Sequence, residues 1–211
     1  MGCSRLQATV ARTASDGNEG SRRVSRVASA PVLQKLFSDL FDAHPVWYQN
    51  FNLVPGGATV TGVAPVPNQG SSASFLQDRI LVREEMTSLT LDEFLEKVEG
   101  VARCALERLA IPVLTAEQCV IRALVTPRNY QDSREFLTHG MLRFPAERWG
   151  PLGRDLSMLG LRLVFPNTPT DNSLYNVRVE SYGGDVRSLF LEVSGVFPAV
   201  TTAAQISLLS Q

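Results

Sequence analysis

Apolar and polar positions along the chain follow a helical period in three segments. In residues 31–44 apolar side chains recur every three or four positions, which predicts a helix of about three turns ended by Pro45. A longer helical pattern covers residues 90–111, where Thr90 and Glu93 have the spacing of a capping box. A short helix is expected over 132–139, closed by Gly140. The sequence therefore predicts one long helix and two shorter ones.

Alternating apolar and polar residues predict six or seven strands, which are joined mostly by turns and not by helices. The segments are 46–53, 59–63, 76–86, 118–126, 159–165, 175–182 and 188–197. This order favours an α+β fold with a mostly antiparallel sheet, packed by the three helices. The last three strands form a C-terminal meander, whose valines and leucines we expect to be buried under the long helix.

Three regions are expected from composition. Residues 1–30 are rich in Ser, Arg, Ala and Gly without a sustained apolar period, and predict a flexible basic arm. Residues 31–197 form a single α+β domain in this interpretation, with the polar stretch 65–74 as its best internal linker candidate. Residues 198–211 are expected to be a loosely attached C-terminal tail.

The formal net charge of −1 for the 211 residues is unevenly distributed. The first thirty residues hold five arginines and two acidic residues, a surplus of three positive charges, so the rest of the chain carries a surplus of four negative charges. Because the body is acidic and its tyrosines are scattered, sequence-specific nucleic-acid binding is not expected. The basic arm alone could contact phosphate backbones without reading sequence.

Cysteine usage and apolar run lengths bear on the location of the protein. Cys3, Cys104 and Cys119 do not form a disulfide framework, so a reducing, cytoplasmic environment is expected. The longest apolar runs are too short for a transmembrane helix. The start MGCSRL resembles a myristoylation site, but Leu6 stands where Ser or Thr is required, so a lipid anchor is not expected.

The charged residues of the final meander are the first candidates for a catalytic site. A five-residue hairpin loop would place Arg178 opposite Glu192, at a distance that allows a cross-strand ion pair. Together with Glu180, and with His139 if the short helix folds over them, they could form an acid/base site. The simpler interpretation is an ion pair that fixes strand register.

Other chemistries have weaker support in the sequence. The two histidines lack the Cys or acidic spacing of a metal site, and no phosphate-binding glycine loop or nucleophile elbow is present, so no metal or cofactor is expected. A Cys-His dyad from Cys104 or Cys119 with His139 stays open as an alternative.

A small, smooth patch on the long helix is the candidate interface. Gly100 and Cys104 lie one turn apart among charged residues that include Lys97, on the side away from the apolar face. A glycine within a helix suggests the close approach of another helix or of a partner chain. The alternative is a neutral solvent-exposed face.

Two functions of different classes follow. The favoured one is a non-catalytic protein-binding or assembly module. Its expected interface is a sheet edge or the outer face of the long helix, used for a protein partner or for self-association as a dimer. The alternative is a small enzyme with an acid/base site on the C-terminal sheet. The run from GLRLVFP through YNVRVESYGGD to LFLEVSGVF is similar to a bacterial domain without an assigned activity, so this resemblance implies no chemistry.

Overall fold

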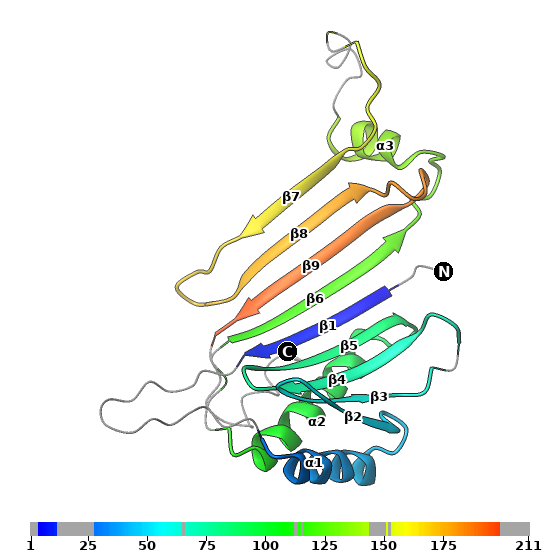
Figure 1. Cartoon of the computed structure of the whole chain (residues 1–211). Helices are drawn as coiled ribbons and strands as arrows, with labels where there is room; N and C mark the ends of the chain where they lie inside the picture. The colour runs from blue at the N-terminus through cyan, green and yellow to red at the C-terminus, as the bar shows by residue number, and fades with distance from the viewer. Residues whose placement is uncertain are drawn as a thin grey trace. The chain divides into compact units, whose positions relative to one another are not determined.

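The computed structural model describes residues 4–11, 28–64, 66–111, 114, 116–143, 151 and 153–198, with side chains described from residue 28 onward (Figure 1). The chain divides into two compact units. The N-terminal unit comprises Arg5–Cys119 and Val196–Gln211, and the C-terminal unit comprises Met1–Ser4 and Val120–Gly195. The single domain expected over 31–197 stays a prediction, because compactness does not measure independent folding.

The N-terminal unit contains an antiparallel sheet with the order β2-β3-β4-β5. Its strands are β2 Asn50–Val54, β3 Gly57–Thr61, β4 Gly70–Leu76 and β5 Arg79–Thr87. Consecutive strands are neighbours, and they are joined by hairpins, as the turn signals predict. Strand β1, Ser4–Ala11, lies beside β5.

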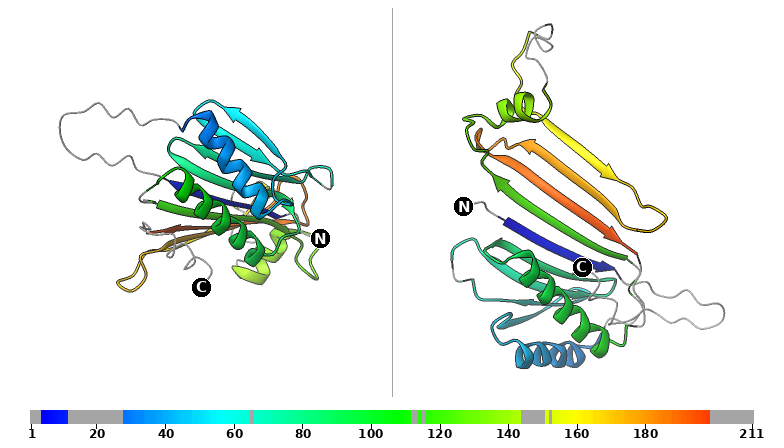
Figure 2. Two further views of the ribbon diagram at one scale, coloured as in Figure 1. Left: turned by 90° about the horizontal axis from the view of Figure 1, so that it is seen from below. Right: turned by 180° about the vertical axis from the view of Figure 1, so that it is seen from behind.

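Two helices cover one face of this sheet (Figures 1 and 2). They are α1 Ala30–Ala43 and α2 Leu91–Arg108. In α2 the Thr90 hydroxyl accepts a hydrogen bond from Glu93 N–H, and Glu93 accepts one from Thr90 N–H, so the predicted capping box is present. The apolar residues of both helices and of the inward strand positions form the core, which includes Leu36, Leu40, Val60, Phe75, Val82, Phe94 and Val101.

The C-terminal unit has a second antiparallel sheet, in the order β6-β9-β8-β7. Its strands are β6 Ala116–Val125, which begins before the unit boundary, β7 Gly160–Phe165, β8 Leu174–Ser181 and β9 Leu189–Phe197, which ends after it. The helical segments are α3 Ser133–Glu135 and the π-helix η1 Phe136–Met141. Leu137 of η1 packs with Val179 and Leu189, so η1 covers part of one sheet face.

The α+β class with antiparallel sheets is confirmed, but the expected arrangement of sheet and helices is corrected in two respects. The strands of the two units follow two antiparallel four-strand orders, β2-β3-β4-β5 and β6-β9-β8-β7, which do not match the single sheet of six or seven strands exactly. Both α1 and α2 are long, with 14 and 18 residues, and α2 packs in the N-terminal unit. The covered apolar residues of the meander, such as Val179 and Leu189, pack with η1 of their own unit and not with the long helix, whereas Leu163 and Val193 are exposed.

The expected linker 65–74 is wrong over its second half, because Gly70–Leu76 forms β4 between β3 and β5. Its serines suggested a loop by composition. Alternate residues Ala73 and Phe75 are nevertheless buried, and Ser74 shares a hydrogen bond with Thr59 of β3. The small hydroxyl side chains of this central strand can therefore form their hydrogen bonds with residues of the neighbouring strands.

The first thirty residues also differ from the flexible arm that composition indicated. Ser4–Ala11 forms β1, and the sequence RLQATVA does alternate apolar and polar residues over this short stretch. The part of the expected arm from 12 to 27, and the expected tail from 199 to 211, lie outside the described residues.

The short helix near residue 135 ends later than predicted. Asp132 caps its start, as its side chain accepts a hydrogen bond from Arg134 N–H. Gly140 lies within the π-turn, and the residue with left-handed backbone after the helix is Arg143, with φ of 48°. The wider π-turn moves the end of the helix beyond Gly140. No helix in the described part of the chain is both long and apolar enough to cross a membrane.

Candidate functional site

The charged residues of the meander lie on the C-terminal sheet, but they pair differently from the prediction. The Tyr182 N–H bond to Ser188 C=O closes the hairpin loop at the expected length. Arg178 then donates two hydrogen bonds to Glu180 on its own strand, and Glu192 accepts one from Arg122 of β6. The expected Arg178–Glu192 ion pair is replaced by these two pairs, because each carboxylate has a nearer guanidinium.

These residues have the surroundings of surface ion pairs. Arg178 is exposed, and its guanidinium carbon lies 5.5 Å from the centre of the Phe190 ring. The hydrogen bonds and the charge of Glu180 raise the pKa of Arg178 above its ordinary value, so it stays protonated. His139 is exposed on η1, and no hydrogen bond or ion pair between described residues joins it to the other three. The acid/base site stays a prediction.

Gly100 and Cys104, the candidate interface, face α1 and the turn that follows it within the same chain. A Cβ atom on Gly100 would lie 2.9 Å from the Trp47 ring, and Cys104 Sγ lies 3.8 Å from the Leu36 carbonyl oxygen. Both residues line a pocket of about 440 Å³ between the two helices. The glycine thus permits the close approach of an intramolecular neighbour, and a contact of this patch with a partner chain stays a prediction.

The two described cysteines are poor candidates for nucleophiles. Burial raises the pKa of the Cys104 thiol to about 11, with further contributions from the charges of Asp39 and Glu107. Burial alone raises the pKa of the Cys119 thiol to about 11. A catalytic cysteine needs the thiolate near neutral pH, so these environments disfavour the Cys-His dyad. Among the described residues no group of three or more His, Cys, Asp or Glu is placed to hold a metal ion.

The edge strand of the C-terminal sheet, as far as the described strands show, is apolar. Strand β7 stands last in the strand order and pairs with β8 through the register Leu163↔Val177. Leu163, Val164 and Phe165 are 44 %, 53 % and 51 % exposed. Their side chains alternate between the two faces of the strand. Natural edge strands are usually protected by charge, proline or a bulge, and in β7 the single charged residue is Arg162.

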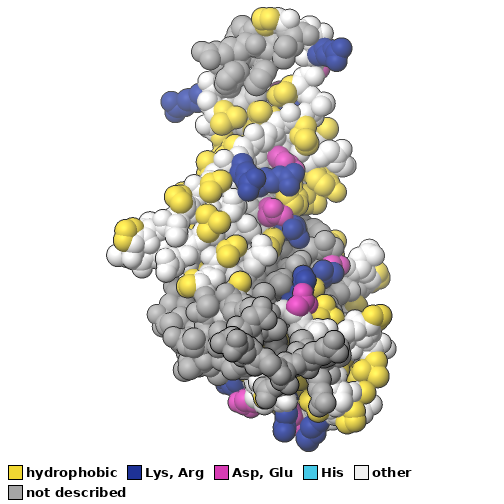
Figure 3. Space-filling model, turned by 60° about the vertical axis from the view of Figure 1, so that its left-hand side comes forward, with side chains coloured by type: hydrophobic (Ala, Val, Ile, Leu, Met, Phe, Trp, Pro, Cys, Tyr) yellow, Lys and Arg dark blue, Asp and Glu magenta, His cyan; other side chains and the backbone are white. Residues whose placement is uncertain are grey.

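One sheet face continues this apolar surface beyond the cover of η1. Leu161 and Leu191 pack with the Leu137 cluster, and alternation along the strands puts Leu163, Phe165 and Val193 on the same face. These three residues are all exposed. We call Leu163, Phe165 and Val193 the apolar extension. Figure 3 shows one face of the molecule, on which hydrophobic side chains are exposed beside basic and acidic residues.

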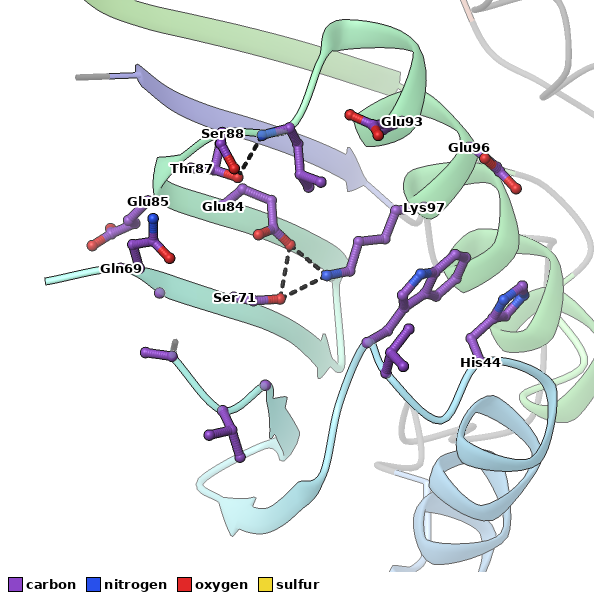
Figure 4. Close-up of a pocket in the computed structure, with 17 residues that line it drawn as sticks. His44, Gln69, Ser71, Glu84, Glu85, Thr87, Ser88, Glu93, Glu96 and Lys97 are labelled. Carbon is purple, nitrogen blue, oxygen red and sulfur yellow. Dashed lines mark hydrogen bonds and ion pairs between the residues drawn. The ribbon is translucent and has the colours of Figure 1, made fainter. Parts of the chain in front are cut away.

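A buried ion pair in the N-terminal unit was missed by the sequence analysis, which put Lys97 on an exposed patch. Lys97 Nζ lies 2.7 Å from Glu84 Oε1, and the side chains are only 7 % and 5 % exposed (Figure 4). Ser71 Oγ accepts a hydrogen bond from Lys97 and donates one to Glu84. The signal was present in β5, because Glu84 is in phase with the buried Ile80 and Val82.

Aromatic rings enclose this ion pair. Lys97 Nζ lies 4.6 Å from the centre of the Tyr48 ring, and Tyr48 is buried. Burial, and secondly the charge of Glu84, raise the pKa of Tyr48 well above its ordinary value. His44 stacks on Trp47 with ring centres 3.6 Å apart. Burial beside the ion pair therefore keeps Tyr48 a neutral phenol.

Comparison with known proteins gives no match to a protein-family model, to a curated protein or to a solved structure.

The Gly100–Trp47 contact generates the first prediction. Replacing a glycine within a helix by alanine ordinarily stabilises a protein by roughly 0.5–1 kcal/mol. In Gly100→Ala the new methyl group meets a fixed indole ring, so we expect the free energy of unfolding to fall by about 1 kcal/mol. Urea denaturation of the wild type and the variant measures the change. In a Trp47→Ala background the same substitution should become stabilising, and a gain in the presence of Trp47 would contradict the tight contact.

Glu117 of β6 generates the second prediction. Its side chain is buried, and neither oxygen has a hydrogen-bond partner among the described residues. Burial raises the pKa of Glu117 from 4.5 to about 7. The folded state therefore holds this proton more tightly than the unfolded state. The protonated Glu117 contributes to the free energy of unfolding, and this contribution is fully present below pH 4.5. It is lost as the pH rises through about 7.

The substitution Glu117→Gln should remove the loss of stability that the ionisation of Glu117 causes as the pH rises. Between pH 4.5 and pH 8 the free energy of unfolding of the wild type should decrease by about 3 kcal/mol more than that of Glu117→Gln. Urea denaturation at a series of pH values measures the difference. Glu117→Asp keeps a carboxyl group and should retain a pH-dependent loss. Parallel pH profiles for the wild type and Glu117→Gln would show that Glu117 does not titrate in this range.

Proposed function

We propose that the chain is a non-catalytic assembly module that binds a second copy of itself through the β7 edge. The observation that carries the proposal is that β7 has a neighbouring strand on one side only among the described strands, and that it exposes apolar side chains on both faces. An edge of this kind is a template for adding a strand from another chain. The apolar extension lies on the same strand and its sheet face, so a second copy would cover both.

The sequence of β7 is suited to antiparallel pairing with itself. With Leu163 on a two-fold axis, Leu163 lies opposite Leu163 of the second copy, and Leu161 lies opposite Phe165. Arg162 then lies opposite Val164, so no like charges meet directly. A two-fold axis perpendicular to the sheet places the same face of both copies on the same side of the joined sheet. The pairs of Leu163 with Leu163 and of Leu161 with Phe165 then lie on the face that carries the apolar extension. Five consecutive residues thus supply a self-complementary pairing.

The experiment that tests this function places like charges at the two-fold axis. Leu163→Lys should shift a dimer to monomer, with a dimer dissociation constant at least about tenfold higher, because two ammonium groups would lie opposite each other. Sedimentation velocity over a concentration series measures the change. The matched control is Val186→Lys in the β8–β9 loop, where Val186 is 57 % exposed, and association should be unchanged.

A charge-swap mixture makes the test specific. Leu163→Lys and Leu163→Glu should each be monomeric alone, whereas an equal mixture should associate, because opposite charges then meet at the central position. A wild-type chain that stays monomeric throughout the concentration series would contradict the second copy as the occupant. Dimers that persist in Leu163→Lys would place the interface away from β7.

A further inference from the structure

A pocket of about 490 Å³ opens above the Lys97–Glu84 pair, entirely within the N-terminal unit. Its walls come from the turn after α1, from β4 and β5, and from the first two turns of α2 (Figure 4). This volume lies within the range of small-molecule sites. The pocket shares no residue with β7, so it is independent of the proposed assembly function.

The floor of the pocket is a built polar site. Glu84 Oε1 takes the bonds from Lys97 and Ser71, whereas Glu84 Oε2 accepts no hydrogen bond from the described residues. A buried ion pair often stabilises a fold less than apolar residues of the same size would. The pair orients α2 on the sheet, and it also leaves a polar group at the floor of the pocket. A buried carboxylate with one oxygen left over is suited to a hydrogen-bond donor that enters from the pocket.

The rim of the pocket is acidic. Glu85, Glu93 and Glu96 line it with Glu84, so four carboxylates stand against the ammonium of Lys97. Hydrogen bonds from the backbone and hydroxyl of Thr90 lower the pKa of Glu93, which keeps it ionised at neutral pH. Arg83 lies 3.8 Å from Glu85 and offsets part of that charge. The surplus favours a cationic ligand over an anion.

The N-terminus of α2 also favours a cationic ligand over an anion. A helix N-terminus can bind an anion through its free N–H groups. In α2 the capping box takes up the N–H groups of Thr90 and Glu93, and the Glu93 carboxylate occupies this end of the helix. An anion would therefore meet a carboxylate where it needs a donor.

Apolar side chains lie between the charged groups. Val46, Val63 and Leu89 line the pocket, and Trp47 forms a wall fixed by its stack on His44. Methylene groups could pack against these side chains, and an ammonium group can be attracted to an indole ring. The pocket thus alternates carboxylates with apolar contacts, over a volume that accommodates a short chain.

We propose that this pocket binds an aliphatic polyamine, with one ammonium donating to Glu84 Oε2 and a second meeting the carboxylates of Glu93 and Glu96. The methylene segments lie against Trp47 and the apolar lining. Lys97 positions Glu84 and does not itself contact the ligand. The separation of the carboxylates and the apolar surface between them favour this class of ligand.

Isothermal titration calorimetry of the full chain with spermidine tests the site. The wild type should bind one spermidine per chain, and 1,7-heptanediol, which has the methylenes without the charges, should not bind. Glu96→Gln removes an exposed rim carboxylate and should weaken binding about fivefold, as one partly screened charge contact implies. Absence of saturable spermidine binding, or equal binding of the diol, would overturn the proposal.

Two further variants separate the pocket from general attraction to an acidic surface. Glu99→Gln makes the same change of charge on α2 outside the pocket, where Glu99 pairs with Arg103, and should leave the affinity within about twofold of the wild type. Val63→Trp blocks the pocket from an exposed position without altering charge, and should abolish binding while circular dichroism shows a folded chain. Equal effects of Glu96→Gln and Glu99→Gln, or unchanged binding in Val63→Trp, would contradict the site.

Discussion

The buried pair of Lys97 and Glu84 is the constraint on which the N-terminal unit depends. Both charged groups are removed from water, and each compensates the charge of the other. Removing one partner would leave the second charge buried without compensation, and would lower the free energy of unfolding by several kcal/mol. The pair joins the middle of α2 to β5, and Ser71 extends it to β4. It therefore fixes both the rotation of α2 about its axis and its position along the sheet.

Local patterns predicted α2, β5 and the final hairpin because their signals are contained within a few residues. The Thr90–Glu93 spacing and the alternation after Leu174 need no knowledge of distant contacts. Lys97 was misplaced for the opposite reason. A lysine becomes a buried residue only when a partner elsewhere in the chain neutralises it, and the phase of Glu84 with Ile80 and Val82 was the one local sign of that partner.

Composition gave a wrong prediction where the polar side chains of a strand form hydrogen bonds with neighbouring strands. The serines of β4 were typical of a loop, but the strand lies between β3 and β5. Its serine hydroxyls form hydrogen bonds with Thr59 and Glu84. Gly100 was recognised as a point of close approach, but the identity of the neighbour depended on how α1 and the following turn fold back. The ionic partners of Arg178 and Glu192 likewise depended on Arg122, which is distant in sequence.

The two partly buried thiols give the fold an internal reporter. Burial raises the pKa of Cys104 and Cys119 to about 11, so both thiols stay protonated at neutral pH and should react slowly with alkylating reagents and peroxide. Transient opening would restore the reactivity of an ordinary cysteine. The rate of thiol modification in native buffer then measures how often the helix layer at Cys104, or strand β6 at Cys119, exposes its interior.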